Sequence, residues 1–407
     1  MKIKTLVSFS RITLVILLVP ALHAQTFSII HSFTNNGGDG GNPEAGVTIR
    51  GGSLFGTTYS GGLGYGTAYQ ITHAGNDWVH VPIAYLPGSS SAPIARVLFG
   101  PDGHLYGTSR SGGQLGSGSA FDLIPPLSLC RDARCSWKVN LLYGFEGPPF
   151  DGYSVGHGDL IWDQQGNIYG TTNGGGPSDA GTVYELTPSN PYWIETPIYI
   201  FSGGADGGRP QAGVIFDSNG NLFGATTLGG SNNAGTIFKL TYMPGVGWTE
   251  TVLYNFTGGN DGKAPFGGLI WDAAGNLYGT TSDAGTGGCG TAFELSPSGQ
   301  TWNLTTLYSF SGQPGNDDGP RASLAMDSTG NLYGTTYRCG ANSRGSIFKL
   351  SNTQNGWVYT SLHDFTAGDD GADPNSNVSI DTDGTLYGTA SSDGGARNYG
   401  VVWMIKP

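Results

Sequence analysis

Four residues in the first half of the chain carry side chains that could perform acid–base chemistry. Glu146, Asp151 and His157 lie close together in the sequence, and Arg110 precedes them. A carboxylate and an imidazole within reach of a substrate can act as general acid and general base. The sequence does not fix the distances among these side chains, so whether they form a catalytic set depends on the elements that carry them.

Acidic side chains also recur in the dipeptide Asp-Gly. Carboxylate oxygens are preferred ligands of Ca²⁺, so a rim of such residues could bind calcium or a cationic ligand. The same dipeptide forms turns, because the aspartate side chain accepts hydrogen bonds from nearby backbone N–H groups. Regular recurrence favours the turn interpretation, and no other cofactor is indicated. The residues are Asp39, Asp151, Asp206, Asp261, Asp318 and Asp370.

The chain contains four cysteines. Cys130 and Cys135 stand in one expected loop and could form a local disulfide, whereas Cys289 and Cys339 stand in equivalent loops of neighbouring repeats and could bridge them. The alternative is a metal site, but a Cys-x4-Cys pair without a nearby histidine does not match the usual zinc spacing. We therefore expect disulfides, which form in oxidising compartments.

Motifs of two large enzyme classes are absent from the sequence. It contains no His-Glu-x-x-His and no phosphate-binding loop ending in Gly-Lys-Ser or Gly-Lys-Thr. These motifs mark zinc peptidases and nucleotide-binding proteins. The sequence therefore gives no motif support for these two classes.

A repeat of the type Leu-Tyr-Gly-Thr-Thr determines the elements that must position these residues. Most copies are introduced by Asp-x-x-Gly-Asn, and the glycines of successive copies are 51 to 63 residues apart. A period of this length indicates a solenoid or a propeller. The copies begin at Leu54, Leu105, Ile168, Leu222, Leu277, Leu332 and Leu386.

Each unit contains four runs of residues that favour strands. In the fifth unit they are 267–272, 276–281, 290–295 and 302–310. Short runs separated by Gly, Asp and Asn predict a meander of β-hairpins, and no stretch shows a helical period.

Aromatic residues recur in register with these strands. We expect the aromatic residues of the third strands to pack between sheets, because large rings fill that gap, rather than to form a sugar-binding ladder. His31 and His363 take the place of a tyrosine in their fourth strands, and we expect them in the core. The third-strand positions are Tyr69, Phe121, Tyr184, Phe238, Phe293, Phe348 and Trp403.

Seven four-stranded units predict an all-β fold, a seven-bladed β-propeller of antiparallel blades over residues 25–407. Residues 26–33 resemble a fourth strand with no first three before it, and residues 400–405 resemble a third strand with no fourth after it. The N-terminal strand would therefore join the C-terminal blade and close the ring, which leaves only short edges. A parallel β-helix is the alternative, but its rungs are shorter than this repeat.

The first 24 residues are typical of a secretory signal peptide. A positively charged region with Lys2, Lys4 and Arg11 comes before an apolar run over 12–18. Small residues near position 24 predict cleavage after Ala24. The run is too short to span a bilayer. We expect a secreted chain, extracellular or periplasmic, with no transmembrane segment after cleavage and no anchoring tail.

The composition is rich in turns and poor in charge. Glycine numbers 71, charged residues make up 12% of the chain, and the formal net charge is −12. An acidic protein of this kind is a poor match for nucleic acid or for an anionic membrane surface.

The repeat resembles the GloVer repeat of secreted bacterial proteins. That family carries tandem units of the type Asp-x-x-Gly-Asn-Leu-Tyr-Gly-Thr-Thr, followed by Gly-Thr-x-Phe-x-Leu. Here the matching segments include 272–281 with 290–295, and 327–336 with 345–350. The resemblance spans essentially all of the chain after residue 24. It implies export and a propeller-like domain, and it implies no established reaction.

The functional expectation is a monomeric, non-catalytic binding scaffold. The second-to-third and fourth-to-first loops are long and varied and should share one face, where variable loops on a rigid scaffold carry function. The expected partner is an extracellular polysaccharide or an envelope protein. The alternative is a propeller enzyme, a lyase or hydrolase acting on a glycan or lactone, with Arg110, Glu146, Asp151 and His157 brought together.

Overall fold

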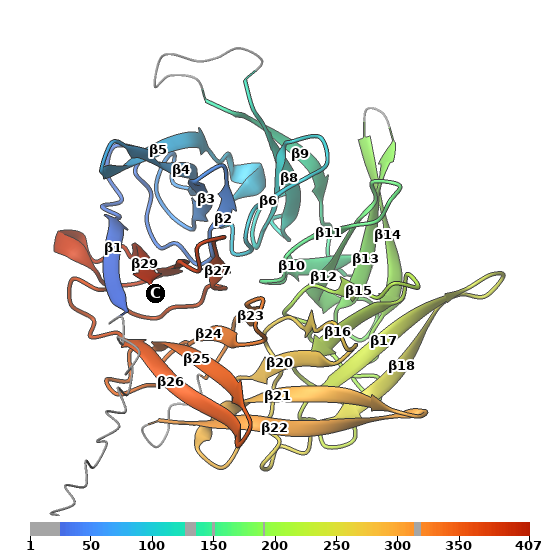
Figure 1. Ribbon diagram of the computed structural model, residues 1–407. Helices are drawn as coiled ribbons and strands as arrows, with labels where there is room; N and C mark the ends of the chain where they lie inside the picture. Colours follow the sequence, from blue (N-terminus) through green and yellow to red (C-terminus); the bar gives the residue numbers. More distant parts are fainter. Residues whose placement is uncertain (1–24, 127–135, 149–150, 190–191, 313–318) are drawn as a thin grey trace, which may run out of the picture.

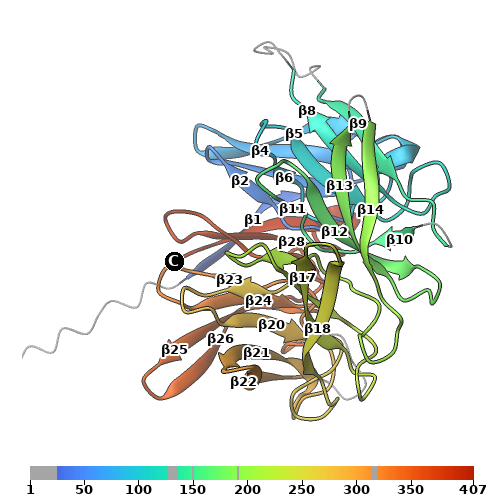
Figure 2. The ribbon, with the colours of Figure 1, turned by 90° about the vertical axis from the view of Figure 1, so that its right-hand side faces the viewer.

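The strands of the protein form seven sheets arranged as blades around a central axis (Figures 1 and 2). The computed structural model describes residues 25–126, 136–148, 151–189, 192–312 and 319–407. Pairing within each blade is antiparallel, and neighbouring strands follow chain order except where β1 joins β29. Apart from two 3-10 turns, Gly88–Ser90 and Gly395–Arg397, these residues contain no helix. The fold is therefore the all-β, seven-bladed propeller that the repeat predicts.

Each blade has four strands, numbered here from the axis outward. Blades 1 and 2 are β2 (Thr48–Arg50), β3 (Ser53–Thr58), β4 (Thr67–Ala74), β5 (Asp77–Tyr85) and β6 (Leu98–Phe99), β7 (Leu105–Ser109), β8 (Ser119–Ile124), β9 (Lys138–Gly144). Blades 3 and 4 are β11 (Ile161–Trp162), β12 (Ile168–Gly175), β13 (Thr182–Ser189), β14 (Tyr192–Ile200) and β15 (Ile215–Phe216), β16 (Leu222–Thr226), β17 (Thr236–Met243), β18 (Gly247–Asn255). Blades 5 and 6 are β19 (Ile270–Trp271), β20 (Leu277–Thr281), β21 (Gly288–Ser298), β22 (Thr301–Ser311) and β23 (Ala325–Met326), β24 (Leu332–Thr336), β25 (Ser346–Thr353), β26 (Gly356–Asp364). Blade 7 is β27 (Ser379–Ile380), β28 (Leu386–Ala390), β29 (Val401–Lys406) and β1 (Thr26–Ser32).

The N-terminal strand closes the ring as expected. β1 pairs antiparallel with β29, with Thr26 opposite Lys406 and Ser32 opposite Val401. Phe33, which follows β1, packs with Val47 of blade 1 and Val402 of blade 7 in one buried cluster. The first and last segments of the chain therefore share a blade.

An extra strand distinguishes blade 3. β10 (Gly152–Val155) pairs with the far end of β12, with Gly152 opposite Gly175 and Val155 opposite Thr172. This strand was not predicted from the sequence. It comes directly before His157 and so fixes the start of the third inner strand.

The glycine of the repeated motif makes room for an aromatic ring. Gly279 lies opposite Phe293 in the sheet, and a Cβ on Gly279 would lie 2.7 Å from the ring. The same arrangement holds in all seven blades, and every one of the seven third-strand aromatic residues has 0% of its surface exposed. The prediction that these rings pack between blades is therefore confirmed, and the glycine is required by packing against the ring.

The two threonines of the motif stabilise the blades through their hydroxyl groups. In blades 3, 5, 6 and 7 the first crosses to the next blade, as when Thr171 Oγ1 donates to the backbone oxygen of Ala212 at 2.8 Å. The second bonds within its own blade, as when the hydroxyls of Thr281 and Thr291 lie 2.9 Å apart. The repeated motif thus serves the fold, and it leaves function to residues that vary between the blades.

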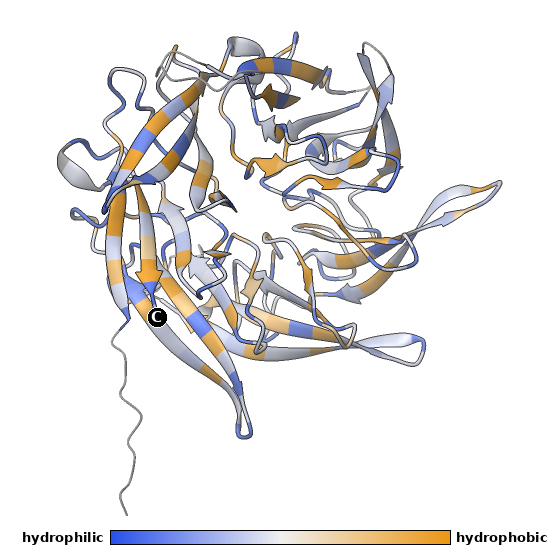
Figure 3. Cartoon of the chain, turned by 45° about the horizontal axis from the view of Figure 1, so that its top comes forward, coloured by the Kyte–Doolittle hydropathy of each residue, from blue (hydrophilic) through white to orange (hydrophobic). Residues whose placement is uncertain are grey.

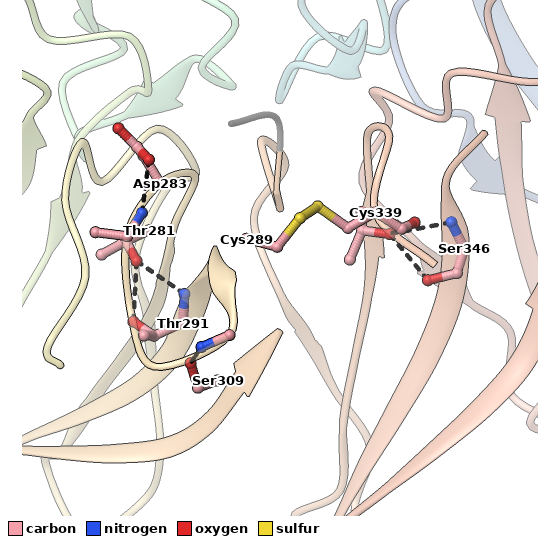
Figure 4. Close-up of a disulfide and its surroundings, with 10 residues drawn as sticks. Thr281, Asp283, Cys289, Thr291, Ser309, Cys339 and Ser346 are labelled. Carbon is pink, nitrogen blue, oxygen red and sulfur yellow. Dashed lines mark hydrogen bonds between the residues drawn. A yellow bond between two sulfur atoms is a disulfide. The ribbon is translucent and has the colours of Figure 1, made fainter. Parts of the chain in front are cut away.

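The disulfide between Cys289 and Cys339 joins β21 of blade 5 to the loop between β24 and β25 of blade 6, with 6.3 Å between the Cα atoms (Figure 4). This confirms the expected bridge between neighbouring repeats. Cys130 and Cys135 lie outside the described residues.

Hydrophobic residues recur along the strands, whereas hydrophilic residues gather in the turns and loops (Figure 3). Apolar side chains of adjacent blades pack together in buried clusters around the ring. His31 and His363 are not core residues, because their side chains are 22% and 20% exposed. The expected signal peptide, residues 1–24, lies outside the described residues.

Candidate functional site

The long loops meet on one face of the propeller. Bridges between backbone groups join a fourth-to-first loop to the second-to-third loop of the following blade in four blades. Examples are Lys263 with Asp283 and Gly208 with Leu228. The two long loop sets therefore share one face, as the loop order predicts, and this face is the candidate binding surface.

One position on this face differs in every blade. In six repeats it follows a proline, and in the third it follows Gly156; the first strand of the blade begins four residues later. Five of these side chains line one pocket, and the other two, Glu44 and Asn375, are joined by a hydrogen bond of 3.2 Å. The seven residues, which we call the mouth ring, are Glu44, Ile94, His157, Gln211, Phe266, Arg321 and Asn375.

The pocket in the mouth ring has a volume of about 220 Å³. Arg110, directly after β7, and Asn173, in the second half of β12, add to its polar lining beside Ser154, His157, Gln211 and Arg321. Such side chains offer hydrogen-bond donors and acceptors at fixed positions, as small-ligand sites require.

A larger cavity of about 600 Å³ lies at the propeller axis and is lined by the inner strands of all seven blades. Its walls are mainly apolar, but Arg96 and Asp159 form an ion pair of 2.5 Å across them. Arg96 also donates to Ser379 Oγ at 3.2 Å. The equivalent positions in the other blades carry Gly, Ser or Asn, so this charged pair breaks the symmetry of the ring.

Two titratable side chains of the mouth ring have pKa values shifted by their surroundings. Burial lowers the pKa of His157 to about 4, and the nearby charges of Arg110 and Arg321 act in the same direction. The imidazole is therefore neutral near pH 7. Burial raises the pKa of Glu44, an effect that Asn375 and Arg321 partly offset.

Cations gather around this mouth although the chain as a whole is acidic. Four of them form ion pairs with aspartates: Arg96 with Asp159, Arg209 with Asp179, Lys263 with Asp283, and Arg338 with Asp373. Arg110 has no ion pair within the described part of the chain, and Arg321 lies over the rings of Tyr337 and Phe266 at 4.2 and 5.5 Å. The six cations are Arg96, Arg110, Arg209, Lys263, Arg321 and Arg338.

Of the four candidate catalytic residues, the structure brings two together. Arg110 and His157 line the same pocket. Asp151 is buried, and its carboxylate accepts hydrogen bonds from the Tyr143 hydroxyl at 2.8 Å and from the backbone of Glu146 at 2.9 Å. Glu146 itself is exposed. The two carboxylates are therefore separate from the pocket lining.

The carboxylates of the Asp-Gly turns bond to their own loops. Asp261 accepts from the Thr257 backbone at 2.8 Å and from the Tyr254 hydroxyl at 3.0 Å, and Asp206 accepts from Ser202 and Tyr199 in the same way. The carboxylates of Asp39 and Asp370 bond to a histidine, His31 and His363, where the other turns have the tyrosine. These bonds are the ones that the turn interpretation predicts. Asp318 lies outside the described residues.

Most of the mouth ring was not predicted from the sequence. Glu44, Gln211, Arg321 and Asn375 escaped notice because residues that repeat dominate the pattern. A usable signal was present, since each follows a recurring proline and none matches its counterparts in the other repeats. Function on a repeat scaffold is carried by the positions that depart from the repeat.

The family model of the Gloeobacter/Verrucomicrobia repeat matches residues 155–403. The chain belongs to this family. That assignment agrees with the repeated motif and with the ring of blades. A search of curated proteins found no significant match.

Solved structures resemble the chain at low sequence identity. An ulvan lyase, a polysaccharide lyase bound to a saccharide of glucuronic acid and sulfated rhamnose, has a TM-score of 0.51 and 11% identity, covering 93% of this chain and 95% of its own. A protein of unknown function from Dyadobacter fermentans has a TM-score of 0.47 and 13% identity, covering 95% and 100%. A hypothetical selenium-binding protein from Sulfolobus tokodaii has a TM-score of 0.49 and 14% identity, covering 83% and 80%.

No helix in the described residues is long and apolar enough to cross a membrane.

Proposed function

We propose that this protein is a secreted, non-catalytic propeller that binds an extracellular polysaccharide carrying carboxylate or sulfate groups at its mouth ring. The observation that supports this most directly is the pocket in which Arg110 and Arg321 flank the neutral His157. Guanidinium groups bind carboxylates and sulfates through paired hydrogen bonds. A neutral imidazole beside them can accept or donate a hydrogen bond to a sugar hydroxyl.

The rest of the lining suits a sugar. Asn173 and Gln211 carry amide groups that can bond to hydroxyls, and Phe266 supplies an apolar surface next to them. The ulvan lyase is an example of a propeller bound to an acidic saccharide, but at 11% identity it shares only the fold with this chain.

The test is binding of purified residues 25–407 to polygalacturonate, chondroitin sulfate and neutral dextran by affinity electrophoresis. We expect the acidic polymers to retard the protein, and we expect Arg110→Gln and Arg321→Gln each to weaken binding about tenfold, the loss of one charge-assisted contact. The control is Lys349→Gln, which removes the same charge from β25, where Lys349 lies over the ring of Tyr333. Equal retardation by dextran, or equal effects of all three variants, would overturn the proposal.

The alternative is a lyase acting on the same acidic glycans. It is favoured by the neutral state of His157 between two cations, because a neutral imidazole can remove a proton while an arginine stabilises the adjacent carboxylate. Incubation with polygalacturonate would then produce unsaturated uronate ends with ultraviolet absorbance, and His157→Asn would abolish them. If the protein binds the polymer but releases no unsaturated product, the result supports the non-catalytic function.

Export and the monomeric state belong to the same proposal. The disulfide between Cys289 and Cys339 fits an oxidising compartment. N-terminal sequencing of the exported protein should begin at Gln25, and light scattering should give the mass of a single chain. If no polysaccharide binds, an envelope protein becomes the expected partner, and crosslinking on intact cells would capture it.

A further inference from the structure

A second cluster of chemically active side chains lies where the ring closes, on the outer strands of blades 7 and 1. His31 is on β1, His80 is on β5, and Asp39 is on the loop that leads from β1 into blade 1. Figure 1 shows β1 and β5 at this junction. The segments are brought together only because the N-terminal strand completes the last blade.

The ligand atoms of the three side chains lie within 4.8 Å of one another. His31 Nε2 is 2.7 Å from Asp39 Oδ1, and His80 Nδ1 is 3.5 Å from the same oxygen. The side chain of His80 is only 8% exposed, and its Nε2 atom is buried without a hydrogen-bond partner. Of the two ring nitrogens of His80, Nδ1 is the one that lies near Asp39.

The cluster departs from the repeat. In the other blades whose fourth strand carries the recurring tryptophan, the residue equivalent to His80, two places after it, is Val139, Glu195, Glu250, Leu304 or Tyr359. His363 repeats the histidine–aspartate pair with Asp370 at 3.0 Å, but its ring stacks on Phe27 at 3.6 Å, which offers no ligand. Two imidazoles and a carboxylate therefore meet at one junction among the described blades.

We propose that His31, Asp39 and His80 bind a divalent transition-metal ion of the Zn²⁺ type at the junction that closes the ring. Imidazole nitrogens with one carboxylate suit zinc, copper, iron and nickel, whereas Ca²⁺ and Mg²⁺ prefer oxygen ligands. This site is therefore chemically distinct from a calcium rim at the Asp-Gly turns, and it is independent of the mouth ring.

Binding requires a small rearrangement. Zinc bonds of about 2.0–2.2 Å place neighbouring ligand atoms roughly 3.3 Å apart, close to the 2.7 and 3.5 Å that separate the two histidine nitrogens from Asp39 Oδ1. The rings of His31 and His80 are stacked, with centroids 4.2 Å apart and planes 5° apart, so their nitrogens do not point to one place. One ring must turn about χ2, a torsion with broad wells and therefore a low cost.

A bound ion would join strand β1 to blade 1. Because it binds only the folded state, it would raise the unfolding midpoint by mass action.

The experiment uses untagged residues 25–407, treated with EDTA and dialysed, and titrated with Zn²⁺, Ca²⁺ or Mg²⁺ while heat and unfolding are monitored. We expect one Zn²⁺ per chain and a rise in the unfolding midpoint with Zn²⁺ alone. Cobalt in place of zinc should give the visible absorbance of a coordinated ion, which reports binding directly.

Three variants use residues that other blades carry at the same positions, so that folding is preserved. His80→Val and His31→Tyr remove one nitrogen each, and the tyrosine can keep the hydrogen bond to Asp39 as Tyr143 does with Asp151. Both should weaken Zn²⁺ binding at least tenfold, whereas the matched control His363→Tyr should leave it unchanged. No uptake of Zn²⁺ or Co²⁺, equal stabilisation by Ca²⁺, or an equal loss in His363→Tyr would overturn the proposal.

Discussion

Glu195 on β14 carries a buried carboxyl group whose Oε1 atom has no hydrogen-bond partner. Burial, together with the nearby charge of Asp151, raises its pKa to about 8. Glu250, at the same position of the next blade, has its pKa raised to about 7 by burial and by Asp206. The folded protein thus holds protons that the unfolded chain, in which a glutamate has its ordinary pKa of 4.5, has already released.

Stability should therefore fall as the pH rises from about 4.5 toward 8, because over this window the folded state binds more protons than the unfolded state. Glu195→Gln removes this linkage. The variant should match the wild type near pH 4 and exceed it at pH 8 by about 1 kcal/mol or more, since one unit of pKa shift corresponds to about 1.4 kcal/mol. Urea unfolding at both pH values measures this. The exposed Glu146→Gln makes the same charge change and should show no such crossover.

Gly279 illustrates how one missing side chain supports a blade. A methyl group there would lie 2.7 Å from the ring of Phe293, so Gly279→Ala should destabilise the protein by about 1–3 kcal/mol, the usual effect of overpacking a core. At Gly204 the added atom would meet only the Ser202 hydroxyl at 3.3 Å, and Gly204→Ala serves as the control. Adding Phe293→Leu should recover part of the loss. A loss of the same size in both glycine variants would contradict the packing argument.

Among the strands, the hydroxyl bonds between blades can be tested with a matched pair. Thr171 on β12 bonds to the backbone oxygen of Ala212 in blade 4, whereas the hydroxyl of Thr57 on β3 is buried with no partner. Thr171→Val should lose about 1 kcal/mol, the net value of one hydrogen bond, while Thr57→Val should be neutral or stabilising because it removes an unsatisfied polar group. Chemical unfolding of both variants decides this, and equal losses would contradict it.

For the molecule as a whole, six cations of the described residues, four of them paired with aspartates, surround one mouth of a chain with a net charge of −12. Local attraction of an acidic polymer then competes with repulsion by the rest of the surface, and both are screened by salt. We expect the affinity for polygalacturonate to fall at least tenfold between about 50 and 500 mM NaCl, and the fall to be shallower in Arg110→Gln. Affinity electrophoresis at several salt concentrations measures the slope. A flat response would contradict an electrostatic site.

Much of this architecture follows from the sequence alone. The recurring Leu-Tyr-Gly-Thr-Thr segment predicts the number of blades, the strand order, the burial of residues such as Phe293 and the joining of β1 to the last blade. The bridge between Cys289 and Cys339 follows from their equivalent places in neighbouring repeats. These features are predictable because a constraint of folding acts on every unit, and so it leaves the same residue types at the same spacing each time.

The composition of the sites was decided only by the tertiary structure. His157 meets Arg321 rather than Glu146 because the inner strands converge on one axis, and sequence distance says nothing about that convergence. His31 meets His80 because ring closure brings the first strand beside blade 1. Residues that vary from one repeat to the next leave no local pattern, so their neighbours are set by the geometry of the closed ring.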